Sequence, residues 1–322
     1  MQKIFRTAAV LSIALVGVLI ALFQILKPDL SAEGKEKARL IGVSYMTMNN
    51  EFYRVMHGQI SDRVEAEGDR IMLRNPALSA QRQIDEISQM LDAGIDALIL
   101  TPVEAEGMTD ILREAKKKGV IIVVVDTSVS DEELVDCTVM SDNYLAGELI
   151  GRYYLEKHDA ADLVLIKHEA AASGRDRVQG FLDTVSSNPD IRVVTELDGE
   201  GQLEKVMPLM EDFLKTGTDF DSVFCLNDPS ALGVIAALEA SGSDPGKDID
   251  VYGVDGAPEA KALIEEGRME ATVAQYPSKL GAEAADVLYR LLNGESTEKK
   301  ILVPVELVTQ ENLDQYYTDR WL

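Results

Sequence analysis

Six stretches of the sequence place polar or aromatic side chains at the carboxyl end of an apolar, strand-like run or in the turn and helix start that follow it. The residues in question are Asn50, Phe52, Tyr53, Asp126, Arg175, Asn227, Asp255 and Gln275. Carboxylates accept hydrogen bonds, amides both donate and accept them, and arginine donates through a planar fork. Aromatic rings offer contact area to the C–H face of a sugar ring. The set therefore predicts a site for one ligand that carries many hydroxyl groups.

The residues of the first stretch, "TMNNEFY", also have structural explanations. Asparagine often caps a helix, so we expect Asn49 to serve the turn before the next helix and Asn50 to face the ligand. Of Phe52 and Tyr53, one is expected to belong to the hydrophobic core.

The other strand-end residues have alternatives of the same kind. Asp126 and Asp255 are also suited to turns, and Arg175, like Arg177, is suited to a surface ion pair. Asp228 is expected to cap the helix that follows it. Each residue is a weak signal by itself, and the prediction rests on their joint position at strand ends.

The sequence lacks the motifs of common enzyme classes. It has no GxSxG nucleophile turn, no P-loop and no dinucleotide-binding glycine pattern, and its three histidines show no metal-ligand spacing. We therefore expect a binding protein without cofactor or metal. Cys137 and Cys225 lie in apolar runs and are expected to be small buried hydrophobic residues, although a disulfide between them stays open.

From Arg39 onward, apolar strand-like runs alternate with amphipathic helical stretches. Examples are "RLIGVSY", "DALILTP", "GVIIVVVD", "ADLVLIK" and "KILVPVEL". Runs this apolar are typical of parallel strands that are buried on both faces of a sheet. The predicted fold class is α/β, with doubly wound parallel sheets.

The sequence also repeats one strand–helix–strand plan. One copy ends at Asp126 and the other at Asp255, about 130 residues later. Two similar doubly wound lobes are therefore expected. Because ligands of open α/β sheets bind outside the carboxyl ends of strands, the two lobes should face each other across a ligand cleft.

The net charge and the N-terminal apolar run indicate which partners the protein has and where it is located. The formal net charge is -25, which argues against nucleic acid as a partner because phosphates require lysine and arginine. The uncharged run Thr7–Leu26 follows two positive charges and is long enough to cross a bilayer. We expect an uncleaved membrane anchor, with a cleaved signal peptide as the alternative, and the remainder of the chain outside the cytoplasm.

With its motifs "TMNNEFY", "VVVDT", "SDNYLAGELIG", "GRDRVQGF", "VFCLNDPSALGVIAAL", "VYGVDGAPEA" and "TVAQYPSKLGAEA", the chain resembles the periplasmic sugar-binding proteins of the ribose-binding type. The resemblance covers about Ala38 to Gln310. It implies two lobes that are joined by a three-segment hinge and close on one sugar. The implied crossings lie near Ser141–Asp142, Gln275–Tyr276 and Glu306–Leu307.

The implied organisation assigns every residue to one of three parts. These are residues 1–38 as anchor or signal peptide plus tether, 39–141 with 276–306 as the N-terminal lobe, and 142–275 with 307–322 as the C-terminal lobe. By the matching motifs, the first lobe would bind the sugar through Asn50, Phe52, Tyr53 and Asp126. The second would bind through Arg175, Asn227 and Asp255, with Gln275 near a crossing.

Three departures from the ribose-binding pattern concern the ligand. Thr127 stands where a ribose binder has arginine, "ELDGEGQL" supplies no aromatic ring from the second lobe, and Tyr53 replaces a phenylalanine. These differences argue against ribose itself and retain a polyhydroxylated ligand, a monosaccharide or similar polyol.

The expected function is capture of this sugar outside the cytoplasm and its delivery to an ABC permease. The alternative is a membrane-anchored sensory module that presents the sugar to a histidine kinase or chemoreceptor. A repressor with this two-lobe core would need an N-terminal DNA-binding segment, where this chain has its apolar run. An enzyme on the same fold is disfavoured by the missing motifs.

Overall fold

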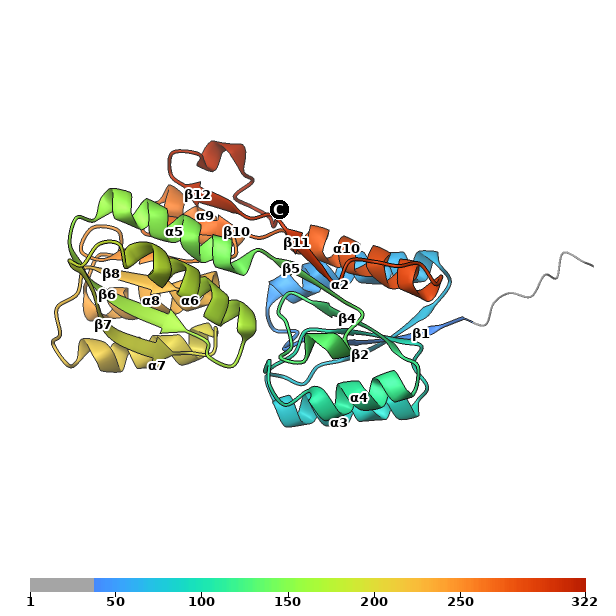
Figure 1. Cartoon of the computed structure of the whole chain (residues 1–322). Helices are drawn as coiled ribbons and strands as arrows, with labels where there is room; N and C mark the ends of the chain where they lie inside the picture. Colours follow the sequence, from blue (N-terminus) through green and yellow to red (C-terminus); the bar gives the residue numbers. More distant parts are fainter. Residues whose placement is uncertain (1–37) are drawn as a thin grey trace, which may run out of the picture. The chain divides into compact units, whose positions relative to one another are not determined.

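The computed structural model describes residues 38–322, which form two lobes, each built on a six-stranded sheet (Figure 1). The strand order is β2-β1-β3-β4-β5-β11 in the first lobe and β7-β6-β8-β9-β10-β12 in the second. The same order therefore occurs twice along the chain. The predicted α/β class and the two similar lobes are confirmed.

The first lobe contains β1 (Leu40–Ser44), α2 (Glu51–Ala66), β2 (Arg70–Arg74), α3 (Ala80–Asp92), β3 (Ala97–Leu100), α4 (Thr109–Lys117), β4 (Ile121–Val125), η1 (Glu132–Leu134), β5 (Cys137–Ser141), α10 (Pro277–Leu292) and β11 (Lys300–Val303). The second lobe contains α5 (Asn143–Lys157), β6 (Ala161–Lys167), α6 (Ala172–Val185), β7 (Ile191–Asp198), α7 (Leu203–Leu214), β8 (Ser222–Cys225), α8 (Asp228–Ser241), β9 (Asp250–Tyr252), α9 (Pro258–Glu265), β10 (Ala271–Ala274), β12 (Glu306–Thr309) and η2 (Leu313–Gln315).

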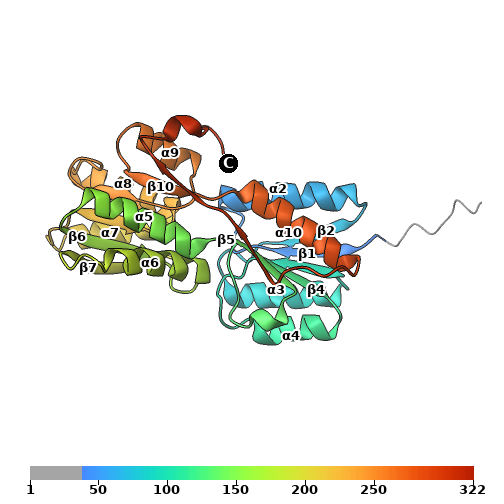
Figure 2. The same ribbon diagram turned by 45° about the horizontal axis from the view of Figure 1, so that its top comes forward.

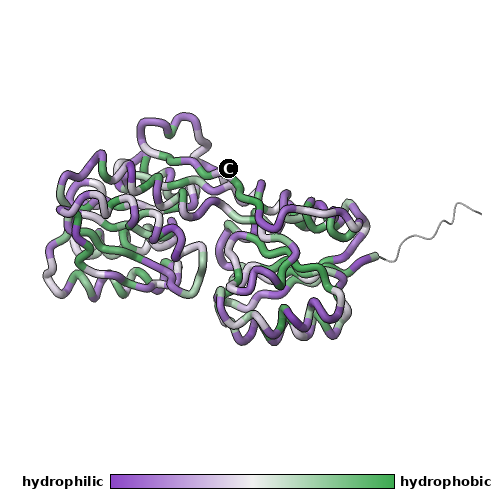
Figure 3. The backbone as a smooth tube through the Cα atoms, viewed as in Figure 1, coloured by the Kyte–Doolittle hydropathy of each residue, from purple (hydrophilic) through white to green (hydrophobic). Residues whose placement is uncertain are grey.

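Helices cover both faces of each sheet. In the first lobe, α2 and α10 lie side by side on one face, and α3 and α4 lie on the other (Figures 1 and 2). Alternate residues of β4 serve the two faces, because Val123 and Val125 pack toward α2 and α10 whereas Ile122 and Val124 pack toward α3 and α4. Hydrophobic residues consequently follow the strands along the backbone (Figure 3).

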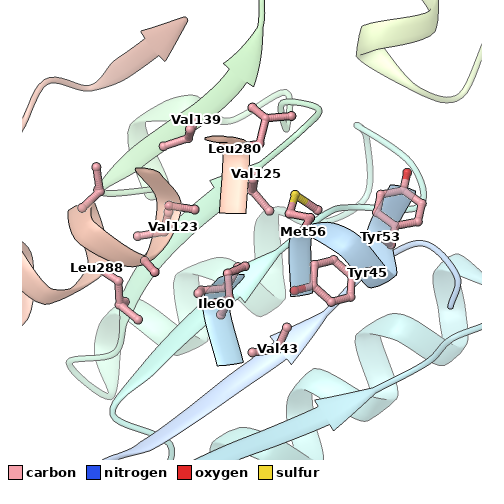
Figure 4. Close-up of a cluster of buried hydrophobic side chains, with 14 of the residues drawn as sticks. Val43, Tyr45, Tyr53, Met56, Ile60, Val123, Val125, Val139, Leu280 and Leu288 are labelled. Atoms are coloured by element: carbon pink, nitrogen blue, oxygen red, sulfur yellow. The ribbon is translucent and has the colours of Figure 1, made fainter. Parts of the chain in front are cut away.

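The core under α2 and α10 reaches the carboxyl end of β1. Figure 4 shows Tyr45 and Tyr53 in this cluster together with Met56 and Ile60 of α2. The ring centroids of the two tyrosines lie 5.8 Å apart with an interplanar angle of 22°. The core of the first lobe thus extends without interruption to the residues that were predicted to bind the ligand.

The chain passes between the two sheets three times. It leaves the first sheet after β5, returns after β10, and crosses again between β11 and β12. The run "KILVPVEL", expected as one strand, forms two strands on either side of Pro304. Because β12 already begins at Glu306 and pairs antiparallel with β10, the third crossing precedes the expected position at Glu306–Leu307.

The predicted membrane segment Thr7–Leu26 lies outside the described residues. Among residues 38–322, no helix is long and apolar enough to cross a membrane.

Candidate functional site

A cavity of about 50 Å³ lies at the carboxyl ends of strands from both sheets. A single water needs about 10–15 Å³, so the cavity has room for a small molecule and not for a chain of sugars. Seven of the eight residues proposed from the sequence line it. They are Asn50, Phe52, Tyr53, Asp126, Asn227, Asp255 and Gln275.

Asp126 and Asp255 occupy equivalent places in the two lobes, directly after β4 and shortly after β9. Both adopt positive φ angles, 77° for Asp126 and 143° for Asp255. Five non-glycine residues among positions 38–322 have positive φ, and four of them line the cavity, namely Leu78, Asp126, Glu200 and Asp255. Strained backbone of this kind is characteristic of functional sites, where the surrounding fold holds it in place.

The two aromatic residues at the start of α2 belong to the core and to the cavity at once. Phe52 is 3% exposed and Tyr53 is 7% exposed, and both line the cavity. The Tyr53 hydroxyl donates a hydrogen bond of 3.2 Å to Oδ2 of Asp126. Both rings therefore belong to the hydrophobic core, where one was expected, and both also line the cavity.

Asn50 and Asn227 both line the cavity and are both N-caps, Asn50 of α2 and Asn227 of α8. Oδ1 of Asn50 accepts from the backbone N–H of Phe52, and Oδ1 of Asn227 accepts from that of Ser230. Nδ2 of Asn227 also donates to the Gly201 carbonyl at 3.1 Å, which leaves its second N–H for a ligand, whereas no protein acceptor is seen for the Asn50 amide among the described residues.

These caps correct two sequence expectations. Asn49, expected to serve the turn alone, is exposed, and Asn50 both caps α2 and lines the cavity. Asp228 is not the cap of α8, because Asn227 fills that position. Asp228 is instead fully buried and accepts hydrogen bonds from the Ala257 N–H and the Thr272 hydroxyl.

Arg175 does not line the cavity, and Arg177 does. The Arg175 side chain is 34% exposed and forms an ion pair of 3.2 Å with Glu106. Arg177 is buried because it follows Gly174 by three residues and precedes Phe181 by four, which places it on the inner face of α6. The surface ion pair, which the sequence left open for either arginine, is the observed role of Arg175.

Arg177 organises the second lobe's side of the cavity. Its Nε donates to Oδ1 of Asn143 at 2.8 Å, and its Nη1 donates to the Leu226 carbonyl and lies 3.3 Å from Oδ1 of Asp255. Nε2 of Gln275 donates to the same Asp255 oxygen at 2.7 Å. Oε1 of Gln275 is buried and has no hydrogen-bond partner among the described residues. Gln275 thus brings an unused hydrogen-bond acceptor to the cavity wall.

The cavity contains more acid than base. Burial raises the pKa of Asp126 to about 6, and the nearby Arg177 partly offsets this increase. Burial also raises the pKa of Asp255, with Arg177 again acting in the opposite direction, and burial raises the pKa of Asp228 behind them. Carboxylates in such an environment gain from hydroxyl donors and repel anions.

His168 is a cavity residue that the sequence reasoning missed. It directly follows β6, is 7% exposed, and is the only ring among the lining residues that comes from the second lobe. Burial lowers the pKa of its imidazole, so the neutral ring can both donate and accept. His168 directly follows the strand-like run "VLIK". Position at the end of a strand, which singled out the other candidate residues, would therefore have pointed to His168 as well.

Thr127, one of the departures from the ribose-binding pattern, connects the two lobes. Its hydroxyl oxygen accepts a hydrogen bond of 2.9 Å from the backbone N–H of Ser173. The Ala105 N–H donates to the Ala170 carbonyl at 3.0 Å in the same region. The lobes are therefore in contact beside the cavity.

Neither cysteine lines the cavity. Cys137 and Cys225 are free and buried, which confirms the interpretation of both as small core residues. Within residues 38–322, no group of three or more His, Cys, Asp or Glu side chains is arranged to hold a metal ion.

Known proteins of one family match this chain over most of its length. The profile of a periplasmic binding protein domain matches residues 41–296. The ribose import binding protein of Bacillus subtilis is 29% identical over 283 residues, which cover 87% of this chain and 90% of that protein. The galactofuranose-binding protein of Escherichia coli is 28% identical over 225 residues, covering 67% and 71% of the two chains.

A solved structure extends the match to three dimensions. The solute-binding protein of an ABC transporter from Bacillus halodurans, with bound myo-inositol, is 25% identical and has a TM-score of 0.82. The similarity covers 89% of this chain and 100% of that one. The chain thus belongs to the periplasmic binding protein family, as an extracytoplasmic solute-binding protein and not an enzyme.

Proposed function

We propose that the protein captures a neutral monosaccharide or cyclic polyol between its lobes and delivers it to an ABC permease. The observation that carries this proposal is the composition of the cavity wall. Asp126 and Asp255 supply acceptors from opposite lobes, Asn50 and Asn227 supply amide donors, and Phe52 and Tyr53 supply ring surface. A ligand whose hydroxyl groups both donate and accept suits such a wall.

The charges that line the cavity favour a neutral ligand over an anionic one. Asp126, Glu200 and Asp255 line the cavity, and Arg177 is the only arginine or lysine among the lining residues. Arg177 is already occupied by Asn143, the Leu226 carbonyl and Asp255. A phosphate or carboxylate on the ligand would therefore face carboxylates without a free cation, which favours neutral sugars over sugar acids and sugar phosphates.

The relatives support the same class of ligand. Their names refer to ribose and galactofuranose, and the related structure contains myo-inositol. Delivery to a permease is supported by the import role in the name of the Bacillus subtilis protein and by the ABC transporter of the Bacillus halodurans protein.

A titration series tests the proposal. The purified protein is titrated calorimetrically with ribose, arabinose, galactose, allose and myo-inositol, and in parallel with gluconate and ribose 5-phosphate. We expect saturable binding of at least one neutral compound and none of the anions. Binding of no neutral compound, or tighter binding of an anion, would contradict the proposal. Loss of uptake of the bound sugar on deletion of the gene tests delivery.

A further inference from the structure

The C-terminal residues Trp321 and Leu322 pack against the hydrophobic cores of both lobes. They contact the cluster that contains Phe52 and Met56 in the first lobe and the cluster that contains Ala260 and Leu313 in the second. They lie twelve and thirteen positions beyond Thr309, the last residue of β12. The end of the chain therefore takes part in joining the lobes.

A buried lysine fixes this chain end to the second lobe. Lys261 of α9 is fully buried, and its Nζ donates a hydrogen bond of 2.7 Å to the Arg320 carbonyl. A buried ammonium group is unfavourable unless it is hydrogen-bonded, so this contact strongly favours one position of the backbone at Arg320. The residue next to Trp321 thus moves with the second lobe.

Trp321 in turn contacts the first lobe at a residue of the cavity. Its ring lies edge-to-face on Phe52, with centroids 5.6 Å apart and an interplanar angle of 74°. Phe52 lines the ligand cavity, and Trp321 lines an adjoining cavity of about 250 Å³. The two cavities share Asn50 and Gln202, so Trp321 stands behind the ring that would face the ligand.

We propose that Trp321 is a positioning residue of the sugar site, which holds Phe52 against the ligand and keeps the two lobes closed. This inference rests on the proposed sugar-binding function. Because Arg320 is held by the second lobe and Phe52 belongs to the first, opening of the cleft separates the two rings. The contact therefore stabilises the closed, ligand-holding state relative to the open state.

Trp321 also provides a direct signal, because it is the only tryptophan of the chain. Its indole Nε1 is buried and has no hydrogen-bond partner among the described residues. Opening would expose this ring to water. We expect a blue shift of the tryptophan emission when ligand closes the cleft.

The test compares Trp321→Ala, Trp321→Phe and the control Tyr317→Ala with the wild-type protein. Tyr317 is a second aromatic residue of the same segment but is 65% exposed. Dissociation of whichever compound of the neutral panel the wild type binds is measured by stopped-flow competition, together with each variant's melting temperature. An edge-to-face pair is expected to change affinity by about 2- to 10-fold.

The expected result is dissociation about 2- to 10-fold faster in Trp321→Ala, with little change in the association rate. Trp321→Phe should restore most of the wild-type rate, and Tyr317→Ala should match the wild type. A lower melting temperature with unchanged dissociation in Trp321→Ala would overturn the positioning role alone. Failure of the wild type to bind any compound of the panel would overturn the proposed function, and the positioning role with it.

Discussion

Two carboxylates, one from each lobe, dominate the chemistry of the cavity. Asp126 and Asp255 are each 4% exposed and adopt unusual backbone angles. Burial raises the pKa of Asp126 from 3.8 to about 6, so its contribution to stability is complete below about pH 4 and is lost as the pH rises through 6. A ligand that donates hydroxyl hydrogen bonds to the ionised carboxylate offsets this loss. Ionisation of the buried Asp126 thus destabilises the protein without ligand, and ligand binding offsets this cost.

The raised pKa of Asp126 predicts pH-dependent binding. Hydroxyl donors favour the ionised form, so binding should lower this pKa and release protons near pH 6. Affinity is expected to fall as the pH decreases below about 6. Calorimetry in two buffers of different ionisation enthalpy measures the protons exchanged. Proton uptake near pH 6, or an affinity that does not change between about pH 5 and pH 8, would be inconsistent with this assignment.

The two arginines of "GRDRVQGF" predict opposite outcomes on substitution. Arg177→Gln leaves Asp255 without its cationic partner and should lower the free energy of unfolding by about 3–5 kcal/mol. Arg175→Gln removes a partly exposed pair with Glu106 and should cost less than about 1 kcal/mol. Urea unfolding of both variants measures the difference. Equal effects would mean that the burial of Arg177 does not hold in solution.

Helical periodicity distinguishes these two arginines in the sequence itself. Gly174, Arg177 and Phe181 share one face of α6, and Arg175 points away from it. Position after a strand alone points to any polar residue in the turn or in the first helical turn, so it does not distinguish Arg175 from Arg177. The dual role of Asn50 was not readable, because a capping asparagine and a ligand-binding asparagine have the same sequence context.

Among the elements, α5 and α6 are packed unusually closely. A Cβ on Gly147 of α5 would lie 1.9 Å from the Arg177 carbonyl oxygen, and one on Gly180 of α6 would lie 2.1 Å from the Tyr144 carbonyl oxygen. The absence of side chains at these two positions allows the helix that carries Arg177 to approach α5. The position of Arg177 in the cavity thus depends on glycines outside it.

This packing predicts the effect of two otherwise similar substitutions. Gly147→Ala must push α6 away from α5 and should destabilise the protein by about 1–3 kcal/mol. Gly58→Ala lies in α2, where nothing is within 4 Å of the new methyl group, and should stabilise by about 0.5–1 kcal/mol through helix propensity. Thermal unfolding of the two variants compares them. A Gly147→Ala protein as stable as Gly58→Ala would refute the close approach.

The elements themselves were largely predictable, because strands buried on both faces leave a strong apolar signal. The exception, "KILVPVEL", is informative. Its residues serve two different sheets with opposite strand pairing, and Pro304 marks the break between them. Apolar character indicates burial but not which sheet a strand joins, so the third crossing between lobes could only be approximated.

In the whole molecule, a few polar contacts join the two lobes beside the cavity. The Ser173 N–H is buried and donates to the Thr127 hydroxyl. Glu106 and Arg175 form a more exposed pair across the same gap. Buried contacts of this type stabilise the closed state more than exposed ion pairs do.

Thr127→Val should therefore weaken ligand binding although the residue does not line the cavity. It leaves the Ser173 N–H without a partner only when the lobes are closed, which is expected to cost about 1–3 kcal/mol, or roughly 5- to 150-fold in affinity. The loss should occur in the dissociation rate, measured by stopped flow. The exposed Thr218→Val serves as control, and equal rates in the two variants would count against this role of Thr127.

The most direct test of the account is a calorimetric titration of Asp126→Asn and Asp255→Asn with the neutral sugar that the wild-type protein binds. The control is Asp110→Asn, whose side chain is 97% exposed on α4. We expect each cavity variant to lose about 10-fold or more in affinity and the control to lose none. Wild-type affinity in both cavity variants would show that the ligand does not bind between these two carboxylates.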